Sequence, residues 1–206
     1  MNNLRKFNWI TQYNSAKEGE ELVKPSVSLV IDKAVVIYDE DKPTPPKFMA
    51  TYNDGRTYKL ECDENATLTT GHTKPTGYDY TKMTSAAIGH CIDTIGNNAF
   101  TSCISLPSID IPNSVTIIGD NAFPKCTSLT SCTIGSGVTL IGYGVFNNCS
   151  SLTSITVNAI VPPTLGGDAF RNTNNCPIYV QSASLTDYQT AWPQYASRIR
   201  PISQKP

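Results

Sequence analysis

The 206-residue sequence is poor in the side chains that carry chemistry and in charge. It has two histidines and no Cys-x₂₋₄-Cys or His-x₃₋₅-His pair, so the common zinc-site spacings are absent. No Gly-x-Ser-x-Gly nucleophile motif occurs. Charged residues make up 16% of the chain and the net charge is −1, which excludes a strongly basic protein with non-specific affinity for nucleic acid.

Long apolar runs are also missing. No stretch approaches the ~18 apolar residues of a membrane span. At the N-terminus, Arg5 and Lys6 resemble a basic start, but the polar residues within 7–14 interrupt the apolar core that a secretory signal requires. We therefore expect a chain that stays in the cell or leaves it by a route that needs no signal.

Small polar side chains are abundant. The chain has 24 threonines, 18 serines and 16 asparagines, over a quarter of its residues. Charge is unevenly spread, because residues 1–90 hold 23 charged side chains and residues 91–206 hold 10. This difference predicts two structural units that join near residues 87–91.

Six columns of residues recur at a fixed step in the second half. An Ile-Gly pair, a phenylalanine, a cysteine, a leucine and a pair of alternating apolar residues return every 23 residues, with one step of 24 at the last phenylalanine. The members are Ile95-Gly96, Ile118-Gly119 and Ile141-Gly142; Phe100, Phe123, Phe146 and Phe170; Cys103, Cys126 and Cys149; Leu106, Leu129 and Leu152; and Ile109/Ile111, Cys132/Ile134, Ile155/Val157 and Ile178/Val180. Chance does not keep six columns in phase over three or four copies.

The repeat predicts a stacked architecture. The two apolar residues of its last pair of columns are separated by one polar residue in most copies. This alternation has the period of a half-buried strand. One short strand per 23 residues cannot bury its own apolar face, so successive turns of chain must stack and share one core. The other columns then point into that core from the far side, and the glycine after each isoleucine is expected to allow a tight bend.

A family resemblance follows from the consensus Ile-Gly-x-x-Ala-Phe-x-x-Cys-x-x-Leu-x-x-Ile-x-Ile-Pro-x-Ser-Val. It resembles the BspA-type leucine-rich repeat of bacterial and phage surface proteins, with its best copies at 95–115, 118–138 and 141–157. A fourth copy keeps Ala169-Phe170 but loses the cysteine and leucine columns, as expected of a terminal turn. The resemblance covers residues 85–206 and implies a scaffold that binds a partner and carries out no reaction.

The expected fold class is mainly β with short helices, in which a small β N-terminal region precedes a short leucine-rich-repeat solenoid with a parallel sheet, a 23-residue period and a C-terminal cap. We divide the chain into an N-terminal attachment segment with a hairpin and a Pro-rich connector (1–45), a β-hairpin and loop region covering the solenoid start (46–86), the repeats (87–180) and the cap (181–206).

Local signals place elements within these segments. Hairpins are expected over residues 26–38 and around the turn at 53–56. In the cap, a short helix over residues 182–192 would begin at Ser182 or Ser184 and end at Pro193, with Leu185, Tyr188 and Trp192 on one face. Residues 195–202 would return as an extended edge.

The N-terminal segment resembles the anchor regions of structural proteins from phages of gut bacteria. The resemblance rests on residues 5–7, 13–17 and 24–30. It implies that this segment attaches the protein to a particle, and it agrees with the missing signal, since a phage protein is made in the cytoplasm and released by lysis.

Seven cysteines raise the question of redox chemistry. Those of the repeat column, and Cys132 in an isoleucine column, are expected to be core residues, although neighbouring turns about 4.7–4.9 Å apart also bring column thiols within disulfide range. Cys62, Cys91 and Cys176 show no partner in the sequence, and the odd total argues against a complete disulfide framework.

We expect no metal, no cofactor and no enzymatic activity. An enzyme would need a pocket within residues 1–90 that holds His72 or His90 with carboxylates. The run Asp39-Glu40-Asp41 lies beside prolines, which indicates a solvated turn. The glycines of Gly135-Ser136-Gly137 lack the third glycine of a dinucleotide loop.

The remaining candidate site is the outward face of the parallel sheet. Its small, mostly uncharged residues give little hot-spot character, so a solvated ladder and a contact surface for a protein or glycan both stay open. The candidate positions are Ser108, Asp110, Ser131, Thr133, Ser154, Thr156, Pro177 and Tyr179.

The predicted function is a non-enzymatic structural or adhesion protein: a phage virion component (fibre, decoration or tail-associated) that displays a leucine-rich-repeat binding domain. Its expected partners are other virion proteins, through the N-terminal segment, and a host-surface protein or glycan. We expect a homo-oligomer, no nucleic acid and no membrane insertion. The alternative is a bacterial cell-surface adhesin that binds host protein or glycan through the repeat sheet.

Overall fold

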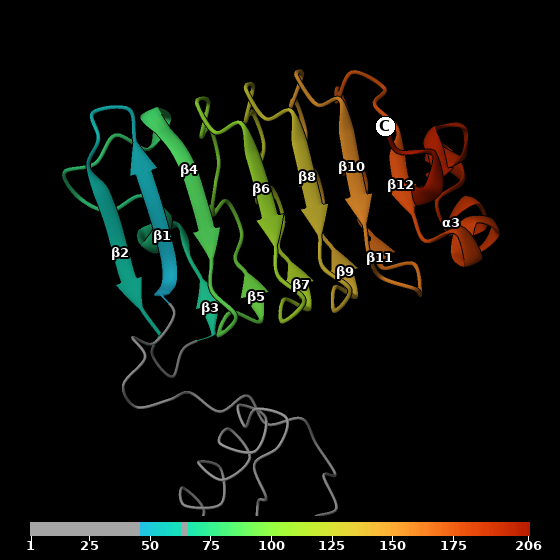
Figure 1. The fold of residues 1–206 in the computed structure, drawn as a ribbon, viewed down its shortest axis with the longest axis horizontal. Helices are drawn as coiled ribbons and strands as arrows, with labels where there is room; N and C mark the ends of the chain where they lie inside the picture. The colour runs from blue at the N-terminus through green and yellow to red at the C-terminus, as the bar shows by residue number, and fades with distance from the viewer. Residues whose placement is uncertain (1–45, 63–65) are drawn as a thin grey trace, which may run out of the picture. The chain divides into compact units, whose positions relative to one another are not determined.

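The computed structural model describes residues 46–62 and 66–206, which lie within one compact unit beginning at Thr44 (Figure 1). The expected attachment segment, its hairpin at 26–38 and the Pro-rich connector lie outside the described residues. The strands are β1 (Pro46–Tyr52), β2 (Thr57–Glu61), β3 (Thr67–Leu68), β4 (Met83–Ile88), β5 (Thr94–Ile95), β6 (Ser108–Ile111), β7 (Ile117–Ile118), β8 (Ser131–Ile134), β9 (Leu140–Ile141), β10 (Ser154–Val157), β11 (Thr164–Leu165), β12 (Ile178–Val180) and β13 (Ile199–Pro201). The helices are α2 (Thr70–Thr73), η1 (Tyr80–Lys82), η2 (Ser182–Ser184), α3 (Leu185–Ala191), η3 (Pro193–Arg198) and η4 (Ile202–Gln204).

Each repeat forms one turn of a solenoid, here called a coil. One side of the coils is a parallel sheet in the order β13-β12-β10-β8-β6, here called the long sheet, and another is a parallel sheet in the order β11-β9-β7-β5-β3, here called the short sheet. The register keeps the sequence period, since Ile109 pairs with Cys132, which pairs with Ile155, which pairs with Ile178. The expected solenoid with a parallel sheet and a 23-residue period is confirmed.

The third side of the coils is held by backbone hydrogen bonds without strands. The amide of Phe100 donates to the carbonyl of Ala122 at 2.7 Å, and the amide of Phe123 donates to that of Val145 at 2.8 Å. Neighbouring coils are therefore bonded on all three sides. This arrangement gives most buried backbone groups a partner in the next coil.

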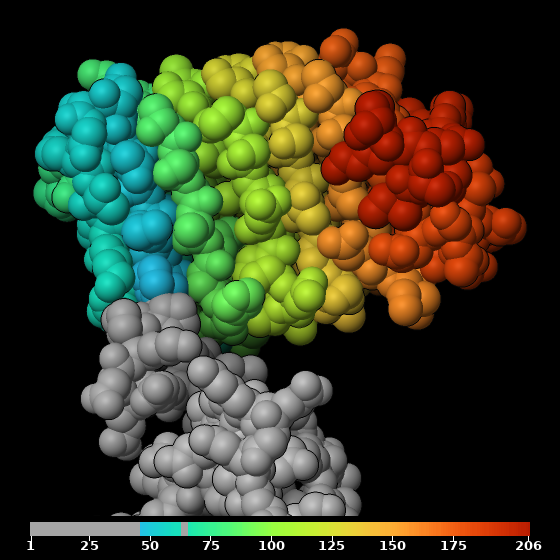
Figure 2. Space-filling view, in the orientation of Figure 1, coloured from blue at the N-terminus to red at the C-terminus, as the bar shows by residue number. Residues whose placement is uncertain are grey.

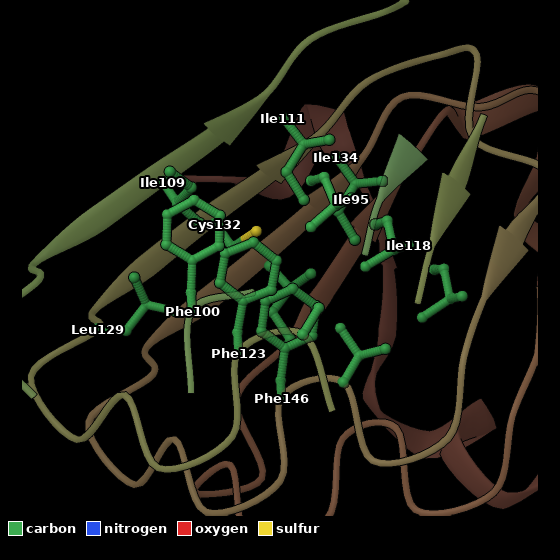
Figure 3. Close-up of a cluster of buried hydrophobic side chains, with 14 of the residues drawn as sticks. Ile95, Phe100, Ile109, Ile111, Ile118, Phe123, Leu129, Cys132, Ile134 and Phe146 are labelled. Atoms are coloured by element: carbon green, nitrogen blue, oxygen red, sulfur yellow. The ribbon is translucent and has the colours of Figure 1, made fainter. Parts of the chain in front are cut away.

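A column of phenylalanines runs through the core. The rings of Phe100, Phe123 and Phe146 lie nearly parallel, with centroids 4.8 and 5.3 Å apart and interplanar angles of 7° (Figure 3). Phe170 continues the stack at 5.8 Å from Phe146. All four rings are buried. Each phenylalanine ring thus stacks on the rings of the neighbouring coils, so the core extends through all four coils that carry one.

The repeated glycine has a different role from the one expected. A tight bend would require a left-handed backbone, but Gly96, Gly119 and Gly142 do not have positive φ. A Cβ added at Gly119 would instead lie 2.8 Å from the amide nitrogen of Asn97 and 3.0 Å from the carbonyl carbon of Gly96. The glycine column is therefore required because two coils approach each other closely, backbone against backbone.

The left-handed backbone occurs at two other columns of the coil. Half of their eight positions carry asparagine, which together with glycine adopts this conformation most readily. Their members are Asn98, Asn121, Gly144 and Asp168, and Ser102, Lys125, Asn148 and Asn172. The abundance of asparagine in the repeats thus reflects two sharp turns in every coil.

The N-terminal end of the solenoid is covered by an antiparallel hairpin. β1 pairs with β2 and, on its other side, with β4, which packs beside β6 (Figure 1). The turn between β1 and β2 contains Gly55 with φ +82°, as the hairpin predicted at residues 53–56 requires. The short-sheet ladder reaches back to β3, where Thr67 pairs with Thr94, so stacked coils begin before the boundary expected at residue 87.

The C-terminal end is covered by α3 and η3. Tyr188 and Trp192 are buried, and they donate to the carbonyls of Ala159 at 2.8 Å and Pro163 at 3.0 Å. The predicted helix and its apolar face are thus confirmed, although Ser184 at its N-cap position makes no side-chain cap bond. The extended edge predicted over residues 195–202 is wrong at its start: η3 continues to Arg198, and only β13 is extended, in parallel beside β12.

Replacement of Gly119 by alanine tests the close approach of the coils. The added methyl group would overlap the backbone of the preceding coil, so we expect Gly119→Ala to destabilise the fold by about 1–3 kcal/mol and to lower Tm by roughly 2–4 °C per kcal/mol. Thermal unfolding followed by circular dichroism measures the change.

Gly71→Ala is the matched control, because the nearest atom to its added Cβ is Thr69 Oγ1 at 3.7 Å. We expect its Tm to lie close to that of the unmodified protein. Equal stability of the two variants would contradict the role given to the glycine column.

Candidate functional site

The outward side chains of the long sheet form two rows across the coils, here called the ladder face. Backbone register aligns Ser108, Ser131 and Ser154 in one row. The second row runs Asp110, Thr133, Thr156, Tyr179 and Arg200. The structure therefore brings together seven of the eight predicted contact residues, while Pro177 comes directly before β12. It adds Arg200 from β13.

The ladder face is open over β6 and β8 and closes toward β12. Ser108 and Asp110 are exposed, and Ser131, Thr133 and Ser154 are half-buried. Thr156 and Tyr179 are only 4% and 6% exposed, so the expectation of an outward, accessible position is wrong for these two residues.

The cause is the C-terminal tail, which turns back over the sheet after β13. The ammonium of Lys205 donates to the hydroxyl of Thr156 at 2.9 Å. In Figure 2 the C-terminal residues, in red, lie over the last strands of this face. The usable part of the ladder face is thus centred on β6 and β8.

Arg200 was missed by sequence reasoning because β13 lies outside the repeat, where no column predicts its register. The short sheet and the loop after β10 also carry exposed apolar side chains that the repeat pattern did not single out. Ile117 and Leu140 are neighbours on the short sheet, and Ile160 and Val161 are 71% and 77% exposed in the loop that follows β10.

The two histidines considered for catalysis lie in the N-terminal part of the described unit. Nδ1 of His72 accepts a hydrogen bond from the amide of Thr69 at 3.2 Å, which caps the short helix α2. His90 is exposed in the loop after β4. Within residues 46–62 and 66–206, no group of three or more His, Cys, Asp or Glu side chains is arranged to hold a metal ion.

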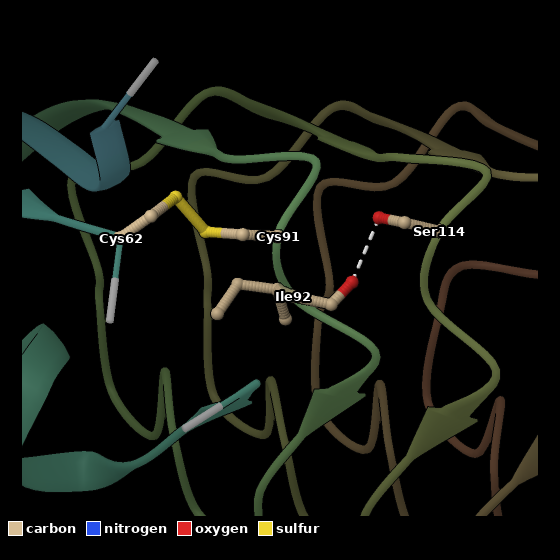
Figure 4. The surroundings of a disulfide bond; sticks show 4 residues. All are labelled: Cys62, Cys91, Ile92 and Ser114. Atoms are coloured by element: carbon tan, nitrogen blue, oxygen red, sulfur yellow. Dashed lines mark hydrogen bonds between the residues drawn. A yellow bond between two sulfur atoms is a disulfide. The ribbon is translucent and has the colours of Figure 1, made fainter. Parts of the chain in front are cut away.

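Two of the cysteines form a disulfide that the sequence did not indicate. Cys62 and Cys91 are bonded with their Cα atoms 6.2 Å apart, although 29 residues separate them (Figure 4). The bond joins the end of β2 to the loop after β4. The expectation that Cys62 and Cys91 lack a partner is therefore wrong, because the hairpin brings back residues that no spacing rule connects.

The other five cysteines are free and buried. The thiols of Cys126 and Cys149 donate to the carbonyls of Phe100 at 3.2 Å and Phe123 at 3.0 Å. Burial raises the pKa of Cys103 and of Cys132, and a hydrogen bond with Cys149 together with burial raises the pKa of Cys126. These thiols stay protonated at neutral pH and are poor nucleophiles.

Across the described residues, no helix is both long and apolar enough to cross a membrane.

Thiol labelling tests the assignment of the cysteines. We expect the native protein to react slowly with a thiol-specific disulfide reagent, since all five free thiols are buried. In denaturant without reductant five thiols should react, and after reduction all seven should react. Rapid labelling of the native state, or seven reactive thiols before reduction, would contradict the assignment.

Comparison with known proteins gives one family and one solved structure of note. The model of the BspA type leucine-rich repeat region matches residues 74–192, in six copies. A crystal structure of a leucine-rich cell surface protein from Faecalibacterium prausnitzii is similar over 79% of this chain, with 21% sequence identity and a TM-score of 0.42. This chain spans 39% of that protein. No curated protein matches the chain.

The family match begins before the first complete copy of the consensus. Ala86 and Ile88 of β4 stand 23 residues before Ile109 and Ile111, so β4 belongs to the same column without keeping the rest of the motif. The matched residues make up more than half of the chain and contain β4 to β12 and α3, and the chain belongs to the BspA-type leucine-rich repeat family.

Proposed function

We propose that this chain is a non-enzymatic binding protein of the bacterial cell surface that contacts a host protein or glycan through the ladder face. The observation that carries the proposal is the register of the long sheet. Backbone pairing holds Ser108, Ser131 and Ser154 in one row and Asp110 and Thr133 in another, so the face is fixed before any partner binds. A pre-organised surface loses little conformational entropy on binding.

The chemistry of the face favours contact over catalysis. Its side chains are hydroxyls, the carboxylate of Asp110 and the guanidinium of Arg200, and in the described part of the chain neither histidine lies on the strands that form it. A serine nucleophile needs a base within hydrogen-bond reach, and a row of hydroxyls without one can still bind hydroxyl-rich or peptide partners.

The disulfide supports a location outside the cytoplasm. Disulfides persist in oxidising surroundings and are rare in cytosolic proteins. The bond between Cys62 and Cys91 joins the end of the N-terminal hairpin to the loop that leads into the first coils. Outside the cytoplasm no pool of reducing thiols is present to break such a bond, so it can persist in a surface protein.

The interpretation as a phage virion component stays a prediction. It depends on residues 1–45, which lie outside the described residues, and the comparisons do not support it. Attachment to other virion proteins and homo-oligomerisation stay predictions for the same reason. The adhesin interpretation, in contrast, depends on the repeat region, which the family match covers.

Binding to epithelial cells and to immobilised mucin tests the proposed function. The double variant Ser131→Arg/Thr133→Arg places two large charged side chains at the centre of the ladder face, and we expect it to lose at least tenfold in bound protein. The reason is steric and electrostatic blocking of the open part of the face over β8.

Thr164→Arg is the control, because Thr164 is exposed on the short sheet, a side of the coils that does not form the ladder face. It should bind as the unmodified protein does, and all variants should have similar Tm values. The proposal is overturned if the unmodified protein binds neither surface, or if the ladder-face variant binds as well as the control.

A further inference from the structure

The C-terminal end of the long sheet carries a recess of about 380 Å³ beside the ladder face. Pro177 and Tyr179 of the last repeat and Arg200 of β13 line it from the sheet. Ser197 and Gln204 line it from the segments before and after β13. This volume lies at the lower end of the range for small-molecule sites, and it suits a single sugar unit.

The recess is positively charged. Arg198 and Arg200 line it, and among the residues that the structure describes no carboxylate does. The surrounding sequence has the same bias, since residues 121–206 contain five basic residues and only two acidic ones, Asp168 and Asp187. An anionic group is therefore favoured in the recess over a neutral or cationic one.

Arg198 is fixed in place by the end of the solenoid. Its guanidinium donates to the carbonyls of Cys176 at 2.9 Å and Phe170 at 3.3 Å. It also donates to the hydroxyl of Thr173 at 2.8 Å and to the sulfur of Cys176 at 3.4 Å, and it lies over the ring of Tyr195. These bonds use most of its donors, so Arg198 contributes a fixed positive charge. A charge held in this way needs no rearrangement when a ligand arrives.

Arg200 is the residue that faces the ligand. Its Nη1 donates to the carbonyl of Ile199 at 2.8 Å, and among the described residues its Nε and Nη2 have no hydrogen-bond partner. One N–H of each of these two nitrogens, on one planar guanidinium, matches the two oxygens of a carboxylate or of a sulfate edge.

The other lining groups suit a sugar ring. Asn175 and Gln204 present exposed amides and Ser197 an exposed hydroxyl, which together offer donors and acceptors for ring hydroxyls. Pro177 and Tyr179 supply apolar surface for the C–H groups of the ring. A few polar groups around a partly apolar wall are typical of small-ligand sites.

A second recess of about 770 Å³ adjoins the first and shares Asn175, Ser197 and Arg198 with it. It extends around the last coil past Arg171 and Gln194. A glycan chain longer than one unit can therefore continue from the first recess over the end of the solenoid.

We propose that the recess at Arg200 binds an anionic sugar unit, carboxylated or sulfated, of a glycan. This deepens the proposed function by naming a glycan class, and it rests on that function only for the glycan being a host ligand. The shared chemistry is an anion of two or three oxygens on a pyranose ring.

Titration of the full-length chain with defined oligosaccharides tests the proposal. The probes are sialyllactose, which carries a carboxylate, lactose 6′-sulfate, and neutral lactose, each followed by saturation-transfer NMR and calorimetry. We expect at least one anionic sugar to bind, neutral lactose to bind at least tenfold more weakly, and the affinity to fall as salt increases. The stronger of the two anionic sugars identifies the group that the recess prefers.

Arg200→Gln removes the charge and keeps an amide of similar length, and we expect it to lose at least tenfold in affinity for the anionic sugar. Lys59→Gln is the control, since it removes one positive charge from the exposed edge strand β2 at the other end of the unit. Failure of both anionic sugars to bind, or equal binding by Arg200→Gln and the unmodified protein at equal Tm, overturns the proposal.

The two proposals fail separately. If the protein binds cells but no anionic sugar, the recess assignment is wrong and the ladder-face function stands. If it binds an anionic sugar but neither cells nor mucin, the function is wrong and the recess assignment stands.

Discussion

The fold depends on one constraint: each coil must return the chain to the same place above the coil before it. Backbone bonds on three sides, the stacked rings of the phenylalanine column and the thiols that donate to the preceding coil all require this registration. The glycine column exists because the coils meet there without room for a Cβ. A change at one such position therefore disturbs a coil and its neighbour together, as nearest-neighbour packing in solenoids implies.

The repetition stops at the ends of the solenoid. There, other residues supply the hydrogen-bond partners that a further coil would supply. At the C-terminal end the amide of Phe170 donates to the hydroxyl of Tyr195 at 3.3 Å, where earlier phenylalanine amides donate to a carbonyl of the next coil. Arg198 donates to the carbonyls of Cys176 and Phe170. The same cap that completes the last coil thus brings basic side chains to the edge of the ladder face.

The cysteines also differ between the repeats and the ends of the solenoid: the thiols of the repeats are free, and the disulfide lies at one end. Thiols within the repeat are buried, and those of Cys126 and Cys149 donate to carbonyls of the preceding coil, so they act as core residues. The oxidised pair lies at the N-terminal hairpin, outside the columns that repeat from coil to coil. Covalent bonding is therefore found where the packing of identical coils does not itself hold the chain.

The sequence by itself determined the period, the core columns, the parallel strands, the cap helix and the hairpin at residues 53–56, because each follows from a local pattern that the chain repeats or from a turn signal. Only the tertiary structure decided which cysteines are bonded, why the glycines are needed, and that Thr156 and Tyr179 are covered. Those features come from contacts between residues far apart in the sequence, such as Lys205 with Thr156 and Cys62 with Cys91. The repeat pattern does not predict such contacts, because each of them occurs only once, at an end of the stack of coils.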